Sequence, residues 1–118
     1  MKLRDVLAII EGEVLSKDVD LDREVETGCG ADLMSDVLAF THAGTLLLTG
    51  LTNPQVVRTA EMAEISAIVF VRGKRPPPET IALAAEKGIP LLFSPCTMFE
   101  LCGRLYRAGL PSCGRFDL

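Results

Sequence analysis

The chain has 118 residues, a net charge of −4 and an apolar fraction of 48%. This length suits one domain and can bury a core without disulfides or a metal ion. The acidic balance argues against sequence-independent nucleic-acid binding, which depends on Lys and Arg neutralising phosphates. The apolar runs are too short to cross a membrane, and the N-terminus is not a signal peptide, so we expect a cytoplasmic location.

The first third of the chain predicts short elements. They are a helix over 3–10, strands over 13–15 and 24–28, and a helix from 32 to about 39. Gly28-Cys29-Gly30 is expected to break the second strand. Asp32 is expected to cap the second helix, with Leu33, Val37 and Leu38 on its buried side.

From residue 45 onward, apolar runs alternate with helical patterns. The predicted strands are 45–49, 67–71 and 90–94, and the predicted helices are 53–64, 78–87 and 97–108. Continuous apolar runs such as TLLLT are expected of strands covered on both faces. We therefore predict an α/β fold, a single layer of mainly parallel short strands flanked by helices. It has three clear βα units, plus an N-terminal helix and short strands.

Local signals set the ends of these helices. Asn53 is an N-cap candidate before Pro54, and Thr97 with Glu100 fits a capping box. Cys102 is predicted to lie on the buried stripe of the last helix, with Met98, Leu101 and Leu105. We expect one domain over 1–118, with a core from about 3 to 108 and a loose tail over 110–118.

Three turns are expected to meet at one edge of the sheet, because ligands bind outside the carboxyl ends of parallel strands. Two of these turns run into helix starts, which favour anions, and the third supplies cations. The candidate ligand-binding residues are Gly50, Thr52, Asn53, Arg72, Lys74, Arg75, Ser94 and Thr97. A purely structural interpretation, in which each turn only starts a helix, fits the same residues.

No catalytic, cofactor or metal site is predicted. The sequence lacks the G-x-x-x-x-G-K-[ST], G-x-G-x-x-G and G-x-S-x-G patterns. The four cysteines form no C-x-x-C pair, and the single histidine, His42, is remote in sequence, so a zinc site is not indicated. Cys96 at a helix start is the one candidate for a reactive thiol.

Several segments, in this order and spacing, resemble the DRTGG domain. They are Leu21 to Val25, Asp32 to Val37, Leu48 to Gln55, Val71 to Gly73 and Lys87 to Leu92. The resemblance covers residues 3 to 108, approximately. The chain is similar also to the N-terminal domain of HPr kinase/phosphorylase. The resemblance implies an accessory, regulatory α/β module without known chemistry. Such domains occur attached to phosphotransacetylases and between the CBS domains of some pyrophosphatases.

Three functions follow as hypotheses. The first is a non-catalytic regulatory module that forms a homodimer and binds a small anionic metabolite or nucleotide at the sheet edge. The second is a protein-interaction subunit without a ligand, since the apolar composition hints at surface buried against a partner protein. The third is a thiol-based sensor or enzyme that uses Cys96.

Overall fold

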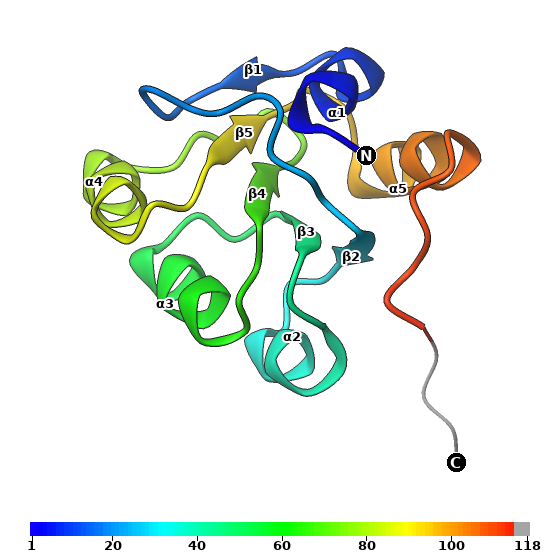
Figure 1. Ribbon diagram of the computed structural model, residues 1–118. Helices are drawn as coiled ribbons and strands as arrows, with labels where there is room; N and C mark the ends of the chain where they lie inside the picture. The colour runs from blue at the N-terminus through cyan, green and yellow to red at the C-terminus, as the bar shows by residue number, and fades with distance from the viewer. Residues whose placement is uncertain (115–118) are drawn as a thin grey trace.

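Five strands form one sheet in the computed structural model, which describes residues 1–114 (Figure 1). Across the sheet the strands lie in the order β1-β5-β4-β3-β2. Strands β2 to β5 run parallel, and β1 pairs with β5 in the antiparallel sense. Their bounds are β1 Glu13–Val14, β2 Thr27–Gly30, β3 Thr45–Thr49, β4 Ala67–Phe70 and β5 Leu91–Phe93.

Five helices in the same part of the chain cover both faces of the sheet. Their bounds are α1 Leu3–Ile10, α2 Met34–Phe40, α3 Pro54–Met62, α4 Pro78–Lys87 and α5 Met98–Arg107. Strands β2 to β5 follow one another across the sheet, so right-handed crossovers bring α2, α3 and α4 to one face. Helices α1 and α5 pack together on the other face (Figure 1). None of the helices described is long and apolar enough to span a membrane.

The two central strands are buried along their whole length. Leu46 and Leu48 of β3 belong to the core under α1 and α5. Leu47 of β3 and Ile68 and Phe70 of β4 belong to the core under α2, α3 and α4. Burial on both faces explains why these strands are continuous apolar runs. The predicted α/β fold with mainly parallel strands is confirmed.

The second strand lies later than predicted. It runs over Thr27–Gly30, so the glycines predicted to break the strand are inside it. A Cβ at Gly30 would lie 2.9 Å from the Cys102 sulfur, and one at Gly28 would lie 3.1 Å from Leu110. The two glycines therefore allow the close approach of α5 and the segment that follows it.

The second helix also departs from prediction. It begins at Met34 with Leu33 as its N-cap, and Asp32 does not cap it. Of the three apolar residues expected on its buried side, only Val37 is buried, while Leu33 and Leu38 are 59% and 44% exposed. The helix has only seven residues, about two turns, and among them Val37 is the one fully buried side chain.

The last helix has the predicted Thr97 cap, but the Glu100 carboxylate pairs with Arg104 and, within the residues described, no reciprocal bond completes the predicted capping box; its buried stripe also agrees only in part. Thr97 accepts a hydrogen bond from the Glu100 N–H, and Arg104 pairs with Glu100 at 2.7 Å. Cys102, expected in the core, is only half-buried. The tail, expected to be loose over 110–118, begins with a buried Leu110. Residues 115–118 lie outside the part that the structure describes.

Candidate functional site

The carboxyl edge of the sheet brings together the turns after β3, β4 and β5. The turn after β4 is tied to the end of β5, because the Arg72 N–H donates to the Cys96 carbonyl at 2.8 Å and the Gly73 N–H donates to the Ser94 carbonyl at 2.9 Å. Arg72 has φ of 56°, in the left-handed region that non-glycine residues rarely adopt. Two backbone hydrogen bonds therefore hold Arg72 in a strained conformation.

The Arg72 side chain lies over the end of the neighbouring strand. A Cβ at Gly50 would lie 3.2 Å from the Arg72 Nη2 atom, so glycine allows the guanidinium to approach the backbone. Arg72 and Lys74 are both exposed. Glu11, Asp18 and Glu64 share this backbone region, so Arg72 is distinguished by its exposed guanidinium beside Gly50. Arg72 and Lys74 supply the positive charge at the edge.

An acidic residue at the same edge was missed by the sequence analysis. The Asp32 Oδ1 atom accepts hydrogen bonds from the Gly50 N–H at 2.8 Å and from the Thr49 hydroxyl at 3.0 Å. The available signal was a carboxylate two residues beyond the carboxyl end of β2 in the parallel sheet. The local sequence pattern instead predicts that Asp32 caps a helix. Because Asp32 already occupies the Gly50 N–H, a phosphate cannot bind there without displacing it.

Three of the predicted residues make hydrogen bonds to the first turns of helices. The Asn53 side chain accepts from the Gln55 N–H at 3.0 Å, and Thr97 accepts from the Glu100 N–H at 3.4 Å. The Thr52 carbonyl accepts from the Thr80 hydroxyl at 2.7 Å, which joins this turn to α4. The structural interpretation of these turns therefore has direct support in their hydrogen bonds.

The side chains of Arg75 and Ser94 are held by contacts with β1, β5 and the end of α1. Arg75 pairs with Glu13 of β1 at 2.8 Å and its guanidinium lies 4.2 Å from the centre of the Phe93 ring. Ser94 is fully buried, and its hydroxyl donates to the Ile10 carbonyl at 2.7 Å. Both residues hold β5 to its neighbours, so neither presents a free group at the edge.

The Cys96 thiol faces a carboxylate. Its sulfur lies 3.8 Å from the Glu11 Oε2 atom, and Glu11 is paired with Arg104 at 2.8 Å. The hydrogen bond from Arg104 lowers the pKa of Glu11 and keeps this carboxyl group ionised. Reactive thiols occur in electropositive surroundings, which a carboxylate partner does not provide.

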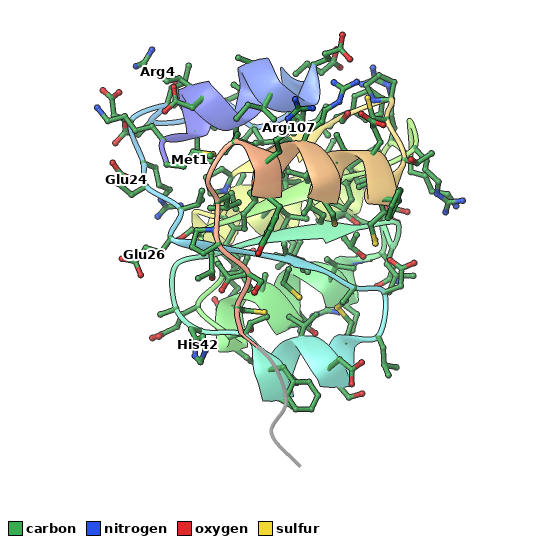
Figure 2. The ribbon with its side chains drawn as sticks, turned by 90° about the vertical axis from the view of Figure 1, so that its right-hand side faces the viewer. Met1, Arg4, Glu24, Glu26, His42 and Arg107 are labelled. Atoms are coloured by element: carbon green, nitrogen blue, oxygen red, sulfur yellow. The ribbon has the colours of Figure 1, made fainter. Side chains whose placement is uncertain are left out.

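The topology also separates Cys96 from the histidine. Cys96 follows β5, whereas His42 precedes β3, so they lie at opposite edges of the parallel sheet. Figure 2 shows His42 on the side of Glu24 and Glu26, where β2 and β3 begin. Within residues 1–114 there is no cluster of three side chains fit to hold a metal ion.

A groove of about 710 Å³ lies at the other edge of the sheet, between residues 15–23 and α4. Its lining includes apolar residues such as Ile81 and Ile89 and none of the predicted site residues. Arg23 is part of its wall and donates to the carbonyls of Ser66 and Gly88 at 3.1 and 3.2 Å. This arginine therefore links the starts of β4 and β5.

The class of protein that these features define is an α/β domain with charged turns at the carboxyl edge of a parallel sheet. A family model describes it more closely: residues 5–108 match the DRTGG domain. The chain belongs to the DRTGG domain family. A comparison with curated proteins finds no match.

A solved structure has a similar fold. It is the crystal structure of the CBS and DRTGG domains of the regulatory region of Clostridium perfringens pyrophosphatase, complexed with its activator diadenosine tetraphosphate. The TM-score is 0.68 at 15% sequence identity, over 93% of this chain and 47% of that chain. The chain thus spans about half the length of that protein's solved region, and at this identity the likeness shows the fold.

The strain at Arg72 can be measured directly. We predict that Arg72→Gly is more stable than Arg72→Ala by about 1 kcal/mol, because glycine adopts φ of 56° without a steric cost. Both variants lack the guanidinium, so the comparison isolates the backbone. Urea denaturation of the two proteins gives the difference. Equal stability, or a more stable alanine variant, would show that this position is unstrained.

Proposed function

We propose that this domain is a non-catalytic regulatory module that binds a small anionic metabolite or nucleotide at the carboxyl edge of its sheet. The observation that carries the proposal is Arg72, held in a strained backbone conformation with its guanidinium over Gly50. Lys74 adds a second exposed cation. Membership of the DRTGG family supports a regulatory role. The cytoplasm is its proposed location.

The nucleotide class has separate support. The similar regulatory region of the pyrophosphatase was solved with diadenosine tetraphosphate. In this chain, Arg72 and Lys74 supply charge for phosphate oxygens, and a guanidinium can bind them through two parallel hydrogen bonds. Asp32 has acceptor capacity left beyond its two hydrogen bonds and suits a ligand hydroxyl, such as that of a ribose. A ligand with both groups should therefore bind better than phosphate alone.

The absence of catalysis is part of the proposal. The Cys96 thiol donates to a carboxylate, and His42 lies at the opposite edge of the sheet. A nucleophile–base pair needs the two groups within hydrogen-bond reach of each other. This separation argues against the thiol enzyme that the sequence left open.

Ligand binding is tested by thermal shift with diadenosine tetraphosphate, ATP, AMP and inorganic phosphate. We expect at least one nucleotide to stabilise the protein, by ~2.7 kcal/mol when the nucleotide concentration is 100 times its dissociation constant. Inorganic phosphate should stabilise the protein less. Arg72→Ala should weaken binding by about tenfold or more, because it removes a charged hydrogen-bond donor.

The matched control is Arg107→Ala, which removes an exposed arginine near the end of α5 (Figure 2). This variant should bind like the unaltered protein. If no ligand stabilises the protein at millimolar concentration, or if both arginine variants lose binding equally, the ligand site proposed at Arg72 is wrong.

A protein-interaction role is the second candidate. Phe99 and Tyr106 of α5 are 89% and 70% exposed. They are seven residues apart, so they lie on the same side of the helix. Exposed aromatic residues are enriched at protein interfaces, and a two-fold homodimer is the commonest closed assembly. We propose self-association through this side of α5.

Sedimentation and light scattering test the assembly. We expect a dimer, and we expect Phe99→Glu to convert it to a monomer by placing a charge in the contact. Met62→Glu changes an apolar residue that is 70% exposed on α3, on the other face of the sheet, and should leave the dimer intact. A protein that is monomeric at all concentrations contradicts this part of the proposal.

A further inference from the structure

The segment after α5 runs along the outer edge of β2. Leu110 is buried in the core below α5, and the Gly28 N–H donates to the Pro111 carbonyl at 2.8 Å. Gly28 and Ser112 form a parallel bridge. Figure 1 shows this segment leaving α5 and passing beside β2. It partly covers a strand edge that would otherwise present unpaired backbone groups.

The register of this bridge sets two cysteines side by side. Cys29 and Cys113 each follow a bridged residue, and although the ladder stops at this one bridge and Cys113 lies in a bend, the two thiols are in contact. Residues paired in register point to the same face of a sheet. At the bridge itself the two segments have the spacing of neighbouring strands, about 4.8 Å, and a disulfide requires a Cα separation of about 4.4–6.8 Å at the adjacent cysteines.

The surroundings of the two thiols agree with this geometry. Both residues are half-buried, and both thiols are free in the structure. Burial is the main cause that raises the pKa of Cys29 to about 11, and the neighbouring Cys113 thiol adds to the increase. The sulfur of Cys102 is packed beside Gly30, whose position in β2 faces the other side of the sheet from Cys29.

We propose that Cys29 and Cys113 form a reversible disulfide that fixes the C-terminal segment to the edge strand β2. Oxidation adds a covalent link to a contact that is otherwise made through one bridge and one buried leucine. The linked segment closes the β2 edge against pairing with another chain. It also fixes one wall of a crevice of about 200 Å³, lined by Gly28, Gly30, Leu105 and Pro111 among others. This inference is independent of the ligand site proposed at Arg72.

The reaction requires a two-electron oxidant, for which a small-molecule disulfide suffices. The Cys113 thiolate attacks one sulfur of that disulfide, forms a mixed disulfide and releases one small thiolate. The Cys29 thiol then loses its proton to solvent, attacks the Cys113 sulfur and releases the second small thiolate. Two protein thiols are oxidised, and one small disulfide is reduced to two thiols. Cys113 attacks first because the raised pKa of Cys29 keeps that thiol protonated.

Peptide mapping tests the link. The reduced protein is equilibrated with oxidised and reduced glutathione, alkylated, and digested with trypsin without reduction. We expect peptide 24–58 joined to peptide 108–115, lighter by two hydrogen atoms than the two together. Cys96 and Cys102 share peptide 88–104 and should be recovered alkylated, so they serve as internal controls.

Variants separate this link from general oxidation. Cys113→Ser should abolish the joined peptide, and Cys102→Ser should leave it unchanged. Oxidation should raise the melting temperature of the unaltered protein by several degrees and that of Cys113→Ser not at all. Recovery of Cys29 and Cys113 only as reduced thiols or glutathione adducts, or a link from Cys113 to Cys102, would overturn the proposal.

Discussion

The burial of β3 and β4 on both faces is the constraint on which the rest of the structure depends. A strand that is apolar on both sides must be covered on both sides, and here α1 and α5 cover one face while α2, α3 and α4 cover the other. Each crossover helix must begin just beyond the carboxyl end of a strand. The turns are therefore gathered at one edge by the same burial that forms the core.

The turns lie together at the carboxyl edge of the sheet, but not every residue in them is available to bind a ligand. Asn53 and Thr97 cap helices, Ser94 holds β5 to the end of α1, and Arg75 holds β5 to β1. Capping and burial use the polar atoms that a ligand would need. Arg72 differs because its backbone is fixed by two hydrogen bonds and its side chain is exposed over a glycine.

The strongly patterned part of the sequence was predictable, and the weakly patterned part was not. The strands TLLLT and AIVF and the helix from Pro78 were found because apolar runs and N-terminal prolines have direct physical causes. The second strand was placed too early, and its end TGCG was predicted as a break, because its glycines are explained only by α5 and Leu110 packing against it. Family membership was also recognised from the order of short segments.

The candidate site, too, could be predicted only in part. The carboxyl edge and its cations could be placed from topology, but the partner of each polar atom depends on side-chain geometry that no local pattern encodes. Asp32 illustrates this, since its carboxylate accepts from residues on the next strand, 17 and 18 positions away. The Cys29–Cys113 pair is a second case, because it depends on the register of a single bridge.

Amide chemical shifts recorded during titration with diadenosine tetraphosphate test the central claim, that the regulatory ligand binds at the carboxyl edge. The account predicts that the largest changes fall on the amides of Gly50, Arg72, Gly73 and Lys74, with smaller changes along β1 and α4. Changes confined to the groove between residues 15–23 and α4, or no changes at millimolar nucleotide, would contradict it.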